Sequence, residues 1–352
     1  MRMVIRSLLF FAVLALLGAL VISKTAAQEG ASKAPPQPRP TPSPAAPAPS
    51  SPPQQQQAQD DESITVTIRR VRLPITVLDK KGQPVTGLTS SDFMILEDKK
   101  QQQIETFADE KESVPIYVGV LMDTSSSTAG KLKFEQESAK NFMYSVVRLR
   151  KDRIAFVTFD DEVRLQQDFT DKLDLLDKAV DSVKKSGGHT SLYDAVWQLC
   201  DEKMRNVSGR RVLVVITDGT DTYSRATLRD AIDIAQRTET IIFGVSTKAG
   251  FSGTVPGVEA GQPSSGADRD LVKLCEETGG AAFFTGDMLA LERAFTKISK
   301  ELHTQYIVTY KPTNDRYDGS YRQIEVKLAN KRDGMKVRTK HGYTAVADTV
   351  RR

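Results

Sequence analysis

Residues 116–127 read IYVGVLMDTSSS. The first seven, Ile116–Met122, form a continuous apolar run, which is typical of a strand buried on both faces of a parallel sheet. Polar residues begin at Asp123, and apolar residues then recur at helical spacing from Phe134 to Val146. The stretch therefore predicts a buried strand that leads through a polar turn into a helix.

The alternation of strand and helix patterns continues to residue 304. Apolar runs predict strands at 154–159, 212–217, 241–245 and 281–284, and helical spacing predicts helices at about 172–185, 191–206, 226–237, 268–278 and 288–303. Such alternation predicts an α/β fold with a doubly wound, mostly parallel sheet over residues 114–304. We expect Trp197, in the helix at 191–206, to belong to the core.

Two β-type segments flank this domain. Residues 64–112 contain the period-two alternation of Val71 to Val77, and residues 305–345 contain the runs Tyr306–Tyr310 and Tyr321–Leu328. Neither segment has enough strands for a sandwich of its own. We expect the N- and C-terminal β segments to pair into one small β module, with the α/β domain inserted between them.

The N-terminal residues predict export. Residues 1–27 combine basic residues, the apolar run Leu8 to Ile22 and small residues up to Ala27, as in a secretory signal peptide. An uncleaved membrane anchor is the alternative, and only then would the chain associate with a membrane. Residues 28–62 are rich in Pro and Gln and predict a disordered linker. We therefore expect a periplasmic or extracellular protein.

Charge and cysteine content narrow the function classes. The formal net charge is +4, and it falls to +1 without Arg2, Arg6 and Lys24 of the predicted signal. This nearly neutral body does not favour a nucleic-acid partner. The two cysteines, Cys200 and Cys275, either pair as a disulfide, which export permits, or serve as small buried apolar residues.

Oxygen-bearing side chains follow the strand at 116–122. The pattern Asp123-x-Ser125-x-Ser127 places a carboxylate and two hydroxyls on one turn. Alone, such a turn is more typical of a helix N-cap. Thr190 lies in a glycine-rich loop before another helix, and Asp218 ends another predicted strand. Ligands of doubly wound sheets bind at the carboxyl ends of strands, so these pieces predict a Mg²⁺ site.

Taken together, these residues resemble the metal-ion-dependent adhesion site of von Willebrand factor A (VWFA) domains, which have a Rossmann-like fold. The whole chain also resembles bacterial exported VWFA-related proteins. The resemblance implies that Asp123, Ser125, Ser127, Thr190 and Asp218 hold one Mg²⁺ (or Mn²⁺ or Ca²⁺), directly or through water. It also implies an open coordination position for an Asp or Glu of a protein partner. Ser191 is an alternative to Thr190.

The function that this resemblance implies is metal-dependent protein binding or adhesion without turnover. No Gly-x-Ser-x-Gly, P-loop or His-Glu-x-x-His motif occurs, and the chain has three histidines, so we expect no enzyme. The alternative is a structural envelope protein in which the metal site braces the fold or is vestigial. Near the site, His189 either tunes it or faces solvent, and Asp194 and Asp221 either orient water at the metal or are helix-terminal and turn residues. The sequence leaves the partner and the oligomeric state open.

Overall fold

The computed structural model describes residues 70–109, 114–128, 132–148, 150–184, 187–217, 220–247, 265–285, 288–329 and 334–346. The predicted signal peptide and linker, and Asp218 of the predicted metal site, lie outside these ranges.

A six-stranded sheet forms the centre of the α/β domain. Its order is β10-β9-β8-β5-β6-β7, and all neighbours are parallel except β6 and β7. The strands are β5 (Ile116–Asp123), β6 (Arg153–Phe159), β7 (Val163–Thr170), β8 (Arg210–Thr217), β9 (Thr240–Ser246) and β10 (Ala282–Phe284). This confirms the predicted α/β class with its mostly parallel sheet.

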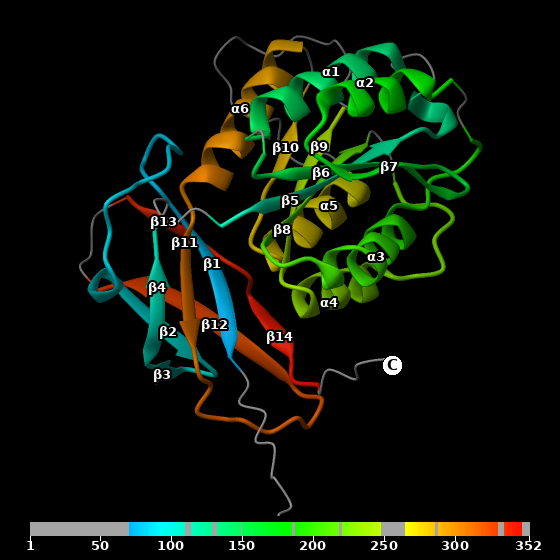
Figure 1. Cartoon of the computed structure of the whole chain (residues 1–352). Helices are drawn as coiled ribbons and strands as arrows, with labels where there is room; N and C mark the ends of the chain where they lie inside the picture. Colours follow the sequence, from blue (N-terminus) through cyan, green and yellow to red (C-terminus); the bar gives the residue numbers. More distant parts are fainter. Residues whose placement is uncertain are drawn as a thin grey trace, which may run out of the picture. The chain divides into compact units, whose positions relative to one another are not determined.

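Helices cover both faces of this sheet (Figure 1). One face packs α1 (Leu132–Val146), α2 (Leu173–Ser182) and α6 (Met288–His303) over a single apolar cluster. The other packs α3 (Leu192–Glu202), α4 (Leu228–Arg237) and α5 (Gly266–Glu277) over a second cluster. Residues alternate between the two clusters along β5, with Val120 in the first and Leu121 in the second, as expected of a strand buried on both faces.

Three details differ from the prediction. The helix expected to reach residue 206 ends at Glu202 and is followed by a 3₁₀ turn, Met204–Asn206. Trp197 is 40% exposed, so its assignment to the core is wrong. The buried face of α3 includes Val196 and Cys200, and one residue step of about 100° carries Trp197 away from that face. The edge strand β7 was not predicted, because its sequence VRLQQDFT is largely polar.

The flanking β segments pair as predicted, which confirms that part of the fold. They form two four-stranded sheets, ordered β13-β1-β11-β4 and β14-β12-β2-β3, and each sheet combines N- and C-terminal strands. The strands are β1 (Val71–Leu78), β2 (Phe93–Glu97), β3 (Lys100–Gln102), β4 (Ile104–Ala108), β11 (Tyr306–Tyr310), β12 (Tyr321–Leu328), β13 (Lys336–Arg338) and β14 (Gly342–Thr344), with a 3₁₀ turn at Ser90–Asp92.

One apolar cluster lies under both of these sheets and includes Ile75, Ile95 and Val308. A buried carboxylate, Glu97 of β2, lies within the same module. Its Oε2 accepts hydrogen bonds from the hydroxyls of Tyr310 (2.6 Å) and Tyr343 (2.9 Å). Since Glu97 precedes the α/β domain and both tyrosines follow it, these bonds join the two ends of the described chain.

Cys200 and Cys275 are free thiols, and both are buried in the cluster beneath α3, α4 and α5. Of the two alternatives predicted for the cysteines, the structure has the second: both serve as small buried apolar residues. Within the described ranges, no helix has both the length and the apolar character needed to cross a membrane.

Candidate functional site

Asp123, the last residue of β5, is fully buried at the carboxyl end of the central strand. Its Oδ1 accepts a hydrogen bond from the Ser125 amide at 2.9 Å, and its Oδ2 accepts one from Thr217 Oγ1 at 2.6 Å. Thr217 ends β8, which pairs with β5. The turn and the neighbouring strand together fix the orientation of this carboxylate.

The two predicted serine ligands lie next to each other. Ser125 is buried and Ser127 is exposed, and their hydroxyl oxygens are 3.0 Å apart. Ser127 belongs to a 3₁₀ turn, Ser126–Thr128, that follows β5. This short turn places both hydroxyls at the same edge of the sheet as Asp123.

The glycine-rich loop that carries Thr190 joins this turn directly. The Gly187 amide donates to the Thr124 carbonyl at 2.9 Å, and Gly187 forms an isolated parallel bridge with Ser125. Thr190 is itself buried, and its carbonyl accepts from the amides of Thr222 (2.9 Å) and Tyr223 (3.1 Å). The structure thus brings together the turn 123–127, the loop 187–190 and the segment that follows β8.

Four of the five predicted ligands thus lie within the described residues, and they occupy adjoining segments. Asp218 directly follows Thr217 in the chain but is outside the described residues. Ser191, the alternative to Thr190, begins α3 as its N-cap. Its hydroxyl is buried and has no hydrogen-bond partner within the described part of the chain.

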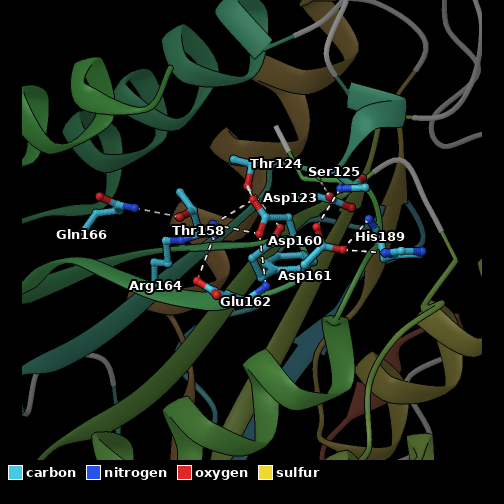
Figure 2. A network of polar contacts seen from close by, with 12 residues as sticks. Asp123, Thr124, Ser125, Thr158, Asp160, Asp161, Glu162, Arg164, Gln166 and His189 are labelled. Carbon is cyan, nitrogen blue, oxygen red and sulfur yellow. Dashed lines mark hydrogen bonds and ion pairs between the residues drawn. The ribbon is translucent and has the colours of Figure 1, made fainter. Parts of the chain in front are cut away.

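Two carboxylates that were not predicted, Asp160 and Asp161, lie beside these segments (Figure 2). They follow β6, the other neighbour of β5. Asp160 Oδ2 accepts from Thr124 Oγ1 at 2.9 Å, and Asp161 accepts from the amides of Gly188 (2.8 Å) and His189 (2.9 Å). The sequence carried a signal for them, because they end a predicted strand at the same edge of the sheet.

The neighbouring polar residues that the sequence left open have distinct surroundings. His189 is exposed; its Nδ1 lies 2.6 Å from Asp161 Oδ1, and its ring stacks on Tyr223 at 4.9 Å. Asp194 accepts from the amides of residues 225 and 226, and Asp221 accepts from the Tyr193 amide at 3.2 Å. Both of these carboxylates therefore stabilise the turns around the start of α3, as one of the two alternatives stated.

An open cleft of about 510 Å³ adjoins the site. At its edge Arg164 of β7 donates to both oxygens of the buried Asp160, at 2.8 and 2.9 Å. The cleft is lined by Thr124, Thr158, Asp160, Arg164, Gln166, Ser182, Val183, Lys184 and Gly187. Two of these residues, Thr124 and Gly187, belong to the segments that carry the predicted ligands.

The chemistry of the predicted ligand set fits a hard divalent cation. All five predicted side chains offer oxygen, and the structure places the Ser125 and Ser127 hydroxyls at the same edge of the sheet as the Asp123 carboxylate. Oxygen ligands of this kind suit Mg²⁺, Mn²⁺ or Ca²⁺. No cluster of three or more His, Cys, Asp or Glu side chains with metal-ligating placement occurs among the described residues. A set with three hydroxyls and one described carboxylate would not form such a cluster.

A family model of the von Willebrand factor type A domain matches residues 118–297. The chain belongs to this family. The matched range begins inside β5 and ends inside α6, so it includes all five predicted ligands of the A domain. No curated protein matches the sequence.

Several solved structures are similar to this chain. An aerotolerance-related membrane protein from Bacteroides fragilis, with multiple mutations to serines, is 16% identical with a TM-score of 0.41, over 53% of this chain and 98% of that one. BatB from Bacteroides thetaiotaomicron is 15% identical with a TM-score of 0.38, over 54% and 100%. Proximal thread matrix protein 1 from the mussel byssus, solved with a zinc occupied MIDAS motif, is 16% identical with a TM-score of 0.44, over 58% and 49%. These likenesses concern the fold; membership of the A-domain family rests on the sequence match.

Proposed function

We propose that this protein is an exported binding module that holds one divalent cation at its A domain and engages an acidic residue of a protein partner. The proposed ligands are Asp123, Ser125, Ser127, Thr190 and Asp218. A bound cation would supply a positive charge with an open coordination position for a carboxylate. The proposal includes no catalytic turnover.

One observation carries this proposal: the turn 123–127 and the loop 187–190 adjoin each other at the carboxyl ends of β5 and β8. The backbone bond from Gly187 to Thr124 and the bond from Thr217 to Asp123 hold the segments together. Family membership supports the same reading. Within the turn, Asp123 is buried and held in one orientation. Ser127 faces solvent, where a partner can approach.

Titration calorimetry of the full chain with Mg²⁺, and then with Mn²⁺, tests the metal site. We expect saturable binding in the wild type and its loss in Asp123→Ala and Ser125→Ala. Ser91→Ala is the matched control, because Ser91 is an exposed residue of the β module whose hydroxyl lies 2.9 Å from the Thr89 hydroxyl. Circular dichroism of each variant establishes that the fold is retained.

Partner recognition is tested with an array of short peptides that contain Asp or Glu, each paired with its Asn or Gln counterpart. We expect Mg²⁺-dependent binding of acidic peptides that chelator abolishes. Saturable metal binding with no preference for acidic over amide peptides would overturn the proposed partner chemistry. If the wild type shows neither binding heat nor a thermal shift with either metal, metal-dependent adhesion is wrong for this chain.

A further inference from the structure

We infer that the consecutive carboxylates Asp160 and Asp161 are positioning residues of the metal site, each holding one of the two segments that supply its hydroxyl ligands. Asp160 holds the turn that carries Ser125, and Asp161 holds the loop that carries Thr190. The inference rests on the proposed metal-binding function and names residues outside the predicted ligand set.

Asp160 reaches the turn through Thr124, which lies between the proposed ligands Asp123 and Ser125. Asp160 is 2% exposed; its Oδ2 accepts from Thr124 Oγ1 at 2.9 Å and its Oδ1 accepts from the Glu162 amide at 3.1 Å. The Arg164 guanidinium bonds to both oxygens from the side of the cleft. A buried carboxylate is costly unless its charge and lone pairs are satisfied. Here they are satisfied by groups that also fix its direction.

Asp161 points the other way, toward the glycine-rich loop (Figure 2). Its Oδ2 accepts from the Gly188 amide at 2.8 Å, and its Oδ1 accepts from the His189 amide at 2.9 Å. The His189 ring nitrogen Nδ1 is a third contact, at 2.6 Å from Oδ1. These bonds fix the backbone of the two residues that precede Thr190, and they hold the pKa of the Asp161 carboxyl below its usual range.

The close approach of Gly187 shows how tightly the two carboxylates and the loop are fitted. A Cβ at position 187 would lie 2.6 Å from both Cβ and Cγ of Asp160, and 2.9 Å from Asp161 Oδ2. Only glycine permits this contact without displacing one of the carboxylates. The loop, its glycine and the two aspartates therefore form one fitted unit beside the proposed ligands.

Groups that orient metal ligands without touching the metal typically change metal affinity by 10–100-fold when mutated. We expect Asp160→Asn and Asp161→Asn each to weaken Mn²⁺ binding to the full chain by about tenfold or more. In each variant the amide NH₂ replaces one carboxylate acceptor and cannot accept a hydrogen bond. Asp168→Asn is the matched control, because Asp168 pairs with Lys203 and lies on β7 between Gln167 and Thr170, which pair with Phe156 and Ile154 of β6 rather than with its carboxyl end. Its affinity should equal that of the wild type.

Amide hydrogen exchange in the metal-free protein gives a second readout that does not depend on metal. Asp161→Asn should speed exchange at Gly188 or His189 by about tenfold, the factor that corresponds to one lost hydrogen bond, and leave the Thr124 amide of the turn unchanged. Asp160→Asn should instead speed exchange at the Thr124 amide, which bonds to the Phe159 carbonyl, and leave Gly188 and His189 unchanged. A general loss of stability would instead speed exchange at all three amides alike.

The outcomes separate this inference from the proposed function. Weakened binding with the crossed exchange pattern supports the inference. Wild-type affinity in both variants overturns it, even if the wild type binds metal as proposed. If the wild type binds no metal, the proposed function fails, and exchange alone decides whether the carboxylates hold the two segments; unchanged exchange in both variants then overturns that as well.

Discussion

Thr217→Val removes one hydrogen bond to the buried carboxylate of Asp123 while keeping the shape of the side chain. In the wild type, Thr217 Oγ1 lies 2.6 Å from Asp123 Oδ2. This separation falls in the range of hydrogen bonds between a hydroxyl and an ionised carboxylate. Asp123 is 0% exposed and Thr217 is 2% exposed, so water has little access to replace the lost donor.

The expected cost follows from this geometry. Hydrogen bonds to charged groups contribute about 1.5–3 kcal/mol, and a buried acceptor that loses its donor forfeits that contribution. For a domain of this size, such a loss lowers the melting temperature by roughly 3–12 °C. The freed carboxylate is also less well oriented toward the proposed cation, so we expect Mn²⁺ affinity to fall by about tenfold or more.

Thr217→Ser provides the matched comparison, because it keeps the hydroxyl and removes only a methyl group, at a cost of about 1 kcal/mol. Thermal melts of the metal-free full chain, followed by Mn²⁺ titration, distinguish the two variants. The valine variant should lose both stability and affinity, whereas the serine variant should keep wild-type affinity. Equal affinities in the two variants would refute the argument that this hydroxyl orients Asp123.

Three further predictions concern other parts of the fold. Burial alone would raise the pKa of Asp152, but hydrogen bonds from the Arg148 guanidinium and from backbone amides lower it below its usual value. Its folded pKa is thus below its unfolded pKa, so its stabilisation is present above the unfolded value of about 4. It is lost as pH falls, and Asp152→Asn should flatten the acid limb of stability measured by denaturant titration between pH 5 and 2. Burial raises the pKa of the Cys200 thiol to about 12, so a maleimide at pH 8 should label it only after denaturation, as mass spectrometry can show; rapid labelling of the native protein would contradict its burial. Tyr310→Phe removes one of two hydroxyls from the buried Glu97 and should destabilise the protein by about 1.5–3 kcal/mol in urea unfolding, whereas an unchanged midpoint would show that this bond contributes nothing.

The fold was largely readable from the sequence because its central strands are buried on both faces. The continuous apolar runs at 116–122, 154–159 and 212–217 predict a parallel sheet that helices cover on both faces. The structure has β5, β6 and β8 at these positions. The edge strand β7 escaped prediction for the opposite reason. An edge strand is half solvated, so the alternation of its side chains weakens and its polar sequence resembles a loop. Trp197 was misassigned because size and apolarity do not report which face of a helix is turned inward.

The candidate site was predictable only where its residues form a local pattern. Asp123, Ser125 and Ser127 share one turn, and Thr190 follows two glycines, so spacing alone drew attention to them. The contacts of Thr217 and Asp160 with the turn join residues 94 and 36 positions apart in the chain. Such contacts depend on the order of strands in the sheet, with β6 and β8 on either side of β5, which spacing along the chain does not reveal.

The hydrogen bonds around the candidate site lead to different expectations for a cation that recognises a partner and for a cation that braces the fold. The Gly187 amide joins the loop to the Thr124 carbonyl of the turn, the Thr124 amide fixes the turn to the Phe159 carbonyl of β6 at 2.9 Å, and Asp161 fixes the loop, so protein groups supply all of these bonds. Chelator should therefore leave the circular dichroism spectrum at 25 °C unchanged. The melting temperature should still fall, because a cation at 100 times its Kd adds about 2.7 kcal/mol to the folded state. Loss of secondary structure at 25 °C in chelator would favour the fold-bracing alternative, since the protein's own hydrogen bonds would then be insufficient to hold these segments together.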